Sequence, residues 1–129
     1  MKRNILTLFL ALFSAVAIMA AGKGAELKFA SNTFDLGTIH ATKGVVKATY
    51  KFTNTGTEPL VIISVSNGGC GCTKPNYPKA PIAPGKSGEI VINFNPSGRK
   101  GELNREVKVK SNAKNGGKQT LRFTGVIIP

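Results

Sequence analysis

The fold is decided by residues 45–53, which read VVKATYKFT. Apolar side chains alternate with polar ones here, so that Val46, Ala48, Tyr50 and Phe52 share one face of an extended chain. The lysines and threonines between them share the other face. This period of two predicts a β-strand with one buried face and one face in solvent.

Similar short stretches recur on both sides of this strand. We expect further extended segments at residues 26–30, 33–39 (with a break at a glycine), 60–65, 89–94, 103–110 and 120–128. Turn residues separate them, as in the Asn-Gly-Gly core of residues 112–118, and no segment has helical periodicity. The sequence therefore predicts an all-β protein, an antiparallel β-sandwich of about seven strands that occupies residues 23–129 as one domain.

The same patterns predict finer features of the sandwich. The inward side chains of the later strands are expected to be Ile90, Ile92, Phe94, Val107, Val109, Leu121, Phe123 and Ile127. Residues 60–65 are apolar on both faces, which favours a central strand covered on both sides. Residues 67–84 contain four prolines, which argue against a central strand there. Residues 54–59 form a turn, in which we expect Gly56 to take a positive φ.

The first 22 residues have the order of a secretory signal peptide. A basic start at Lys2 and Arg3 precedes an apolar run over residues 5–21, and small residues follow up to Gly22. The alternative is an uncleaved anchor of minimal length. Because cleavage leaves no permanent membrane span, we expect residues 23–129 to be periplasmic or secreted.

The chain is strongly basic, with a formal net charge of +12. Its lysines are scattered along the sequence, which is typical of solvent-facing strand positions that oppose edge-to-edge pairing. The alternative is a cationic surface for an anionic envelope polymer, such as lipopolysaccharide or teichoic acid, or for an acidic protein. Nucleic acid is not an expected partner, because the signal peptide predicts export.

The two cysteines of the chain, Cys70 and Cys72, are separated by one residue. Four neighbours complete the motif: Gly68, Gly69, Gly71 and Thr73. An oxidising compartment favours a disulfide between them, and the glycines provide the backbone freedom to close a small ring. Such a ring constrains the unfolded chain little, contributing about 1.6 kcal/mol for three residues.

Three interpretations of the pair therefore stay open. It is a local clip, a thiol–disulfide exchange pair, or two thiolates that bind copper or zinc. His40 is the one further candidate ligand, and a metal site would need ligands from a second chain. The exchange interpretation requires a cation or a helix N-terminus near the thiols, and Lys74 is the nearest cation in the sequence.

The remaining residues do not suggest an enzyme. The single histidine, His40, has no evident nucleophile beside it, and the carboxylates are scattered singly. We expect a protein without catalytic residues and without a cofactor, apart from the exchange and metal interpretations of Cys70 and Cys72.

The sequence resembles the bacterial family called domain of unknown function 1573. The phrases that carry the resemblance are FDLGTI at 34–39, YKFTNTG at 50–56, PL at 59–60, CGCT at 70–73, IAPG at 82–85, Gly88 with IVINF at 90–94, SN at 111–112, and residues 121–125. The wider resemblance is to the immunoglobulin-like folds that include major sperm protein, pilus chaperone and Hydin-type domains, so the expected sandwich is an immunoglobulin-like one. It implies a seven-stranded sandwich and export, and it implies no biochemical activity.

Two functional hypotheses follow from these observations. The first is an exported, non-catalytic binding or structural module of the bacterial cell envelope, with an unidentified protein or an anionic polymer as partner. The second is a small periplasmic thiol-redox or metal protein that acts through Cys70 and Cys72.

Overall fold

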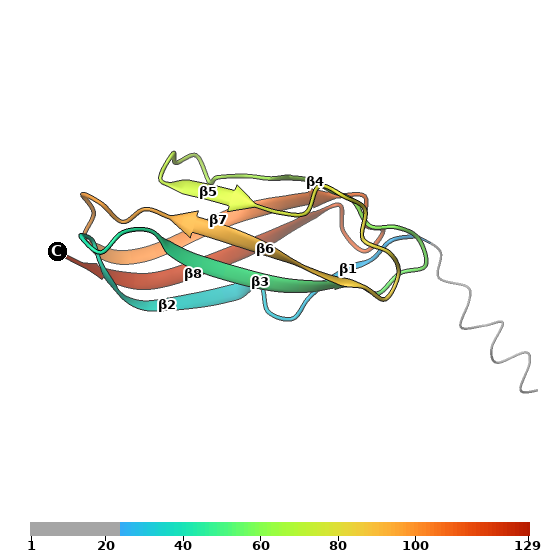
Figure 1. Ribbon diagram of the computed structural model, residues 1–129, viewed down its shortest axis with the longest axis horizontal. Helices are drawn as coiled ribbons and strands as arrows, with labels where there is room; N and C mark the ends of the chain where they lie inside the picture. The colour runs from blue at the N-terminus through green and yellow to red at the C-terminus, as the bar shows by residue number, and fades with distance from the viewer. Residues whose placement is uncertain (1–23) are drawn as a thin grey trace, which may run out of the picture.

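The computed structural model describes residues 24–129, which fold into two four-stranded sheets packed face to face (Figure 1). The predicted signal peptide, residues 1–22, lies outside the described residues. The strands are β1 (Leu27–Phe29), β2 (Thr33–His40), β3 (Val46–Asn54), β4 (Ile62–Val65), β5 (Thr73–Asn76), β6 (Ser87–Phe94), β7 (Gly101–Ser111) and β8 (Lys118–Ile128). Residues 24–129 contain no helix, so the predicted all-β sandwich is confirmed, with eight strands where about seven were expected.

The two sheets differ in the direction of their strands. The first sheet has the order β1-β3-β6-β5, and all its pairs are antiparallel. The second sheet has the order β2-β8-β7-β4, and its β2 runs parallel to β8. The expectation of an entirely antiparallel sandwich is therefore wrong at this pair. The chain crosses from the first sheet to the second between β1 and β2, and no hairpin joins β2 to β8.

The core lies between the sheets and follows the alternation of the sequence. All the side chains predicted to point inward from β6, β7 and β8 are buried, as are Ala48, Tyr50 and Phe52 of β3. Full burial of one large apolar side chain contributes about 1.5–3 kcal/mol, so this apolar layer dominates the stability of the sandwich.

The stretch from Leu60 to Val65 is an exception to the predicted pattern. β4 pairs only with β7 and forms the edge of the second sheet, so the expected doubly covered central strand is wrong. Leu60 and Ile62 are buried, whereas Ile63 is 52% exposed. An apolar run without polar alternation does not distinguish a central strand from an edge strand, which explains the error.

The proline-rich segment contains a short strand that the sequence did not predict. β5 spans only four residues, includes Pro75, and pairs with β6 at the edge of the first sheet. The expectation that no central strand forms here is confirmed. Proline lacks the backbone donor of a ladder, and an edge strand needs its donors on one side only.

β2 contains the predicted glycine break. Its pairing with β8 shifts between Asp35 and Thr38, and Gly37 in this bulge has a φ of 67°. The Gly37 backbone N–H donates to Asp35 Oδ1 at 2.8 Å. A bulge with a left-handed glycine bends the strand locally, which interrupts the long free edge of β2.

The turn after β3 is organised by the buried amide of Asn54. Its Oδ1 accepts hydrogen bonds from the backbone N–H groups of Glu26 and Gly56, and its Nδ2 donates to the carbonyls of Glu58 and Ile82. Gly56 does not have the expected positive φ. A Cβ there would lie 2.1 Å from the carbonyl oxygen of Gly24, so Gly56 is required by close backbone approach.

Candidate functional site

Cys70 and Cys72 lie in the loop between β4 and β5, which leads into β5 at the same end of the sandwich as the C-terminus (Figure 1). The structure joins them by a disulfide, with their Cα atoms 5.2 Å apart. The backbone N–H of Cys72 also donates to Cys70 Sγ at 3.2 Å. The pair therefore forms a small ring beside the first residue of β5.

The loop before the ring turns sharply at two of the predicted motif residues. Gly68 and Gly69 have φ values of 66° and 83°, a region that favours glycine. A Cβ on Gly68 would also lie 2.8 Å from the carbonyl oxygen of Glu106, so this glycine packs directly against β7. Asn67 Oδ1 accepts from the Gly69 N–H at 2.9 Å and holds the turn.

The other two motif residues lie on either side of Cys72. Gly71 is exposed, and its φ is not positive. Thr73 is buried at the start of β5, with its Oγ1 3.6 Å from Cys72 Sγ. The Asn95 N–H donates to the carbonyl of Cys72 at 2.8 Å, so the ring is attached to the end of β6.

The cation beside the disulfide is Arg99, which the sequence did not point to. The half-buried Arg99 belongs to the loop between β6 and β7, and its Nη2 lies 3.2 Å from Cys70 Sγ. Arg99 is 29 residues away in the sequence, and no local pattern links it to the cysteines. An adjacent guanidinium favours the thiolate form of a cysteine. Lys74, the cation expected from the sequence, does not contact either sulfur in an interaction that the structure describes.

A small cavity of about 160 Å³ opens beside Cys72. Its lining consists of Val45, Gly71, Cys72, Lys74, Asn93 and Asn95. Val45 is 56% exposed, so the rim combines an exposed apolar side chain with the ammonium of Lys74. Cys70 does not line this cavity, and the two sulfurs therefore have different surroundings.

The predicted metal ligands are not brought together. Within residues 24–129, no three histidine, cysteine, aspartate or glutamate side chains form a group that could hold a metal ion. His40 is exposed at the end of β2, whereas Cys70 and Cys72 are bonded to each other. The described chain alone does not provide the ligand set that copper or zinc requires.

A second candidate site is the outer face of the first sheet, where scattered lysines converge. Outward positions on β1, β3 and β5 carry four exposed lysines: Lys28, Lys47, Lys51 and Lys74. We call this surface the lysine face. Lys47 and Lys74 both pair in register with Asn93 of β6, so they flank it on neighbouring strands. Glu89, opposite Lys51, is the one carboxylate among the described outward positions of this sheet.

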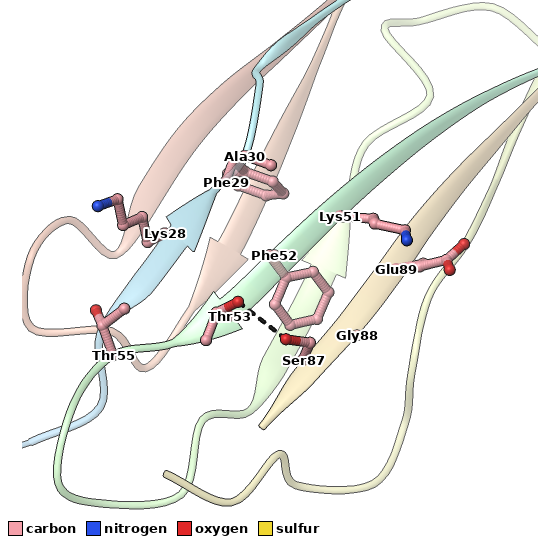
Figure 2. Close-up of a pocket in the computed structure, with 10 residues that line it drawn as sticks. All are labelled: Lys28, Phe29, Ala30, Lys51, Phe52, Thr53, Thr55, Ser87, Gly88 and Glu89. Atoms are coloured by element: carbon pink, nitrogen blue, oxygen red, sulfur yellow. Dashed lines mark hydrogen bonds between the residues drawn. The ribbon is translucent and has the colours of Figure 1, made fainter. Parts of the chain in front are cut away.

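The lysine face is hollowed at one end. A trough of about 600 Å³ runs over β1, β3 and β6, and Figure 2 shows Lys28 and Lys51 on two sides of it. Between them lie the hydroxyls of Thr53 and Ser87, 2.9 Å apart. The trough therefore brings two lysines and two hydroxyls onto one surface, together with the Glu89 carboxylate beside Lys51.

The outer face of the second sheet carries charges of both signs. Asp35, Glu102 and Glu106 are exposed there beside Lys108, Lys110 and Lys118, and Glu106 forms an ion pair with Arg122. Half of the six acidic residues of the chain lie on this face. The excess of cations over carboxylates is therefore larger on the lysine face, although the charges are scattered along the sequence.

The fold is similar to several solved structures. A protein of unknown function from Porphyromonas gingivalis superposes with a TM-score of 0.69 at 18% identity, over 82% of this chain and 48% of its own. The PapD-like domain 7 of human CEP192 gives 0.56 at 13% identity, over 80% and 85%. The periplasmic chaperone SfaE gives 0.52 at 14% identity, over 80% and 56%. At these identities the similarity shows the fold alone.

The chain spans about half the length of the Porphyromonas gingivalis protein. No curated protein matches the sequence. Among residues 24–129, no helix is long and apolar enough to cross a membrane. The model of one family, described as "Protein of unknown function (DUF1573)", matches residues 27–127. That match covers nearly the whole sandwich and every phrase of the resemblance quoted above, and the chain therefore belongs to the DUF1573 family.

Proposed function

We propose that the protein is an exported, non-catalytic binding module of the bacterial cell envelope whose lysine face holds an anionic envelope polymer. The observation that carries the proposal is the contrast between four exposed lysines and one carboxylate on the outer face of the first sheet. Clustered exposed cations raise the local concentration of a polyanion and strengthen its binding at low ionic strength. Phosphate or carboxylate groups on a glycan match the ammonium and hydroxyl groups of the trough.

The proposal is tested by the binding of lipopolysaccharide vesicles to the purified protein over a series of salt concentrations. We expect binding that weakens as salt rises, and we expect the double variant Lys47→Gln/Lys51→Gln to lose most of it. The matched control is Lys108→Gln/Lys110→Gln, which removes the same charge from exposed positions on the opposite sheet. Equal loss in both variants would show that net charge alone drives binding, and the lysine face would then not be the site.

Export is tested separately from binding. The full chain and a chain that starts with methionine followed by residues 23–129 are expressed in a bacterium, and the periplasmic and cytoplasmic fractions are compared. We expect the full chain in the periplasm, shortened by a signal peptide, and the truncated chain in the cytoplasm. A full chain that stays in the cytoplasm at its full mass would contradict the proposal.

A second candidate function is thiol–disulfide exchange through Cys70 and Cys72. The observation that favours it is the contact between Arg99 Nη2 and Cys70 Sγ, since a cation beside sulfur is the feature that activates exchange cysteines. A ring closed by so few residues also adds little to stability, so a structural contribution alone does not explain the pair. The test is the reduction of the pair in glutathione buffers of defined potential, because an easily reduced bridge indicates exchange and a resistant one indicates a clip.

A further inference from the structure

We propose that exchange at this pair begins at the sulfur of Cys72, and that Cys70 leaves as a thiolate held by Arg99. The inference rests on the exchange function proposed above and adds the atom that is attacked, the leaving group and the class of substrate. The substrate is a dithiol of an exported protein, and one of its thiolates enters the cavity beside Cys72.

The surroundings of Cys70 favour the departure of its sulfur as a thiolate. Two donors converge on its Sγ, since the Arg99 Nη2 and the Cys72 backbone N–H each lie 3.2 Å from it. Hydrogen bonds to an ionised group are about twice as strong as those between neutral groups. Both donors therefore bind the Cys70 thiolate more tightly than they bind the sulfur of the disulfide.

The surroundings of Cys72 favour attack of a substrate thiolate on its sulfur. Its Sγ contacts the neutral Oγ1 of Thr73 at 3.6 Å, and the cavity of about 160 Å³ opens on this residue and not on Cys70. Lys74 in the cavity lining attracts an incoming thiolate. The bond from Asn95 N–H to the Cys72 carbonyl keeps the attacked residue attached to β6 while the bridge opens.

The reaction balances in two exchange steps. The first thiolate of the substrate attacks Cys72 Sγ, a substrate–Cys72 disulfide forms, and the Cys70–Cys72 bond breaks with its electron pair going to Cys70. The second substrate thiolate then attacks the substrate sulfur of the mixed disulfide and releases Cys72 as a thiolate. The substrate is oxidised to its disulfide, and the cysteine pair is reduced by two electrons. Exchange is faster when the leaving thiolate is better stabilised, and the contact with Arg99 therefore selects Cys70 as the leaving group in the first step.

The order of attack is tested with reduced glutathione as the probe. The full chain is expressed, and the oxidised protein is purified from the periplasm, mixed with excess glutathione and quenched with acid at early times. The glutathione adduct is located by peptide mass spectrometry. We expect the adduct on Cys72. An adduct on Cys70 would overturn the inference and leave the exchange function standing. A pair that glutathione does not open at any ratio of reduced to oxidised form would remove the exchange function itself.

The role of Arg99 is tested in the same assay. We expect Arg99→Gln to slow the opening of the bridge several-fold, because the departing Cys70 thiolate loses its cation. The matched control is Lys100→Gln, which removes the same charge from the next residue of the loop and should leave the rate near that of the unchanged protein. Equal slowing in both variants, or no slowing in Arg99→Gln, would contradict the assignment of Cys70 as the leaving group. Thermal unfolding of both variants shows whether either change disturbs the fold.

Discussion

At the scale of single residues, the buried amide of Asn54 is expected to contribute strongly to stability. Its fully buried side chain satisfies two backbone donors and two backbone carbonyls. Removing one partner leaves buried polar groups unsatisfied, at about 1–3 kcal/mol for each group that cannot find water. We expect Asn54→Ala to lower the free energy of unfolding by about 3 kcal/mol.

Denaturant titration with urea measures this loss directly. Asn76→Ala is the matched control, because Asn76 is exposed on β5, and a surface change of this kind costs less than about 0.5 kcal/mol. Similar midpoints for the two variants would show that the four hydrogen bonds of Asn54 contribute little.

Tyr50 makes the stability of the sandwich depend on alkaline pH. Its hydroxyl donates to the carbonyl of Arg122 at 2.6 Å, which connects the first sheet to the second, and burial raises the pKa of Tyr50 above its usual value. The unfolded chain loses this proton near pH 10, whereas the folded protein keeps it. The unfolded state then binds fewer protons, so stability falls by about 1.4 kcal/mol per pH unit above pH 10.

The variant Tyr50→Phe isolates this effect. We expect it to lose about 1 kcal/mol at pH 8, because one buried hydrogen bond is gone, and to show a shallower fall in stability between pH 10 and pH 11. Urea unfolding at pH 8, 10 and 11 measures both quantities. Parallel pH profiles for the two proteins would contradict a raised pKa of Tyr50.

At the scale of elements, β1 illustrates how a three-residue edge strand is kept in place. Asn115, in the turn between β7 and β8, pairs its side-chain amide with both the N–H and the carbonyl of Leu27, each at 3.0 Å. The Asn115 amide thus makes the two backbone hydrogen bonds that a neighbouring strand would make to Leu27, and it covers part of the sheet edge. We expect Asn115→Ala to release the Leu27 amide to fast hydrogen exchange, with a loss of about 1–2 kcal/mol in stability.

A matched control is Asn112→Ala, because Asn112 makes the equivalent bonds to Val61 N–H and the Pro59 carbonyl. Hydrogen exchange followed by NMR should show a faster Val61 amide in this variant and an unchanged Leu27 amide. If both variants accelerate both amides equally, the two asparagines stabilise the whole domain and not separate edges.

The elements that the sequence predicts correctly are those whose side chains alternate over a long stretch. β3, β6, β7 and β8 have this pattern, and their buried faces are the predicted ones. β4 and β5 do not: one is apolar throughout, and the other lies in a proline-rich segment. The parallel pairing of β2 with β8 is invisible to periodicity, since alternation predicts which face is buried and not the direction of the neighbouring strand.

The candidate site could be predicted only as far as its local residues. The spacing and the glycines predict that Cys70 and Cys72 lie close together after a sharp turn, but they leave the disulfide and metal interpretations open. The contact with Arg99 depends on how the loop between β6 and β7 folds back over the loop between β4 and β5. The lysine face also depends on the tertiary fold, because β1, β3 and β5 come together only when β3 and β5 pair with β6 and β1 pairs with β3.

At the scale of the whole molecule, the stability of the domain should depend little on its disulfide. The buried apolar residues come from both sheets and form one continuous core, to which Cys72 is only peripheral. The chain-entropy contribution of a three-residue ring is about 1.6 kcal/mol. This is no more than the burial of one large apolar side chain contributes, about 1.5–3 kcal/mol. We therefore expect Cys70→Ser/Cys72→Ser to fold, to keep its lipopolysaccharide binding, and to lose at most about 1.6 kcal/mol.

Urea unfolding of the double variant, beside the unchanged protein with its bridge intact, decides between a structural and a chemical role for the pair. A fold that persists with this small loss means that stability alone does not explain the cysteines, which strengthens the exchange function. A double variant that fails to fold would instead make the ring a structural clip, and the contact with Arg99 would then serve to pack the loop. The comparison must be made without reductant, because a bridge that opens easily would erase the difference between the two proteins.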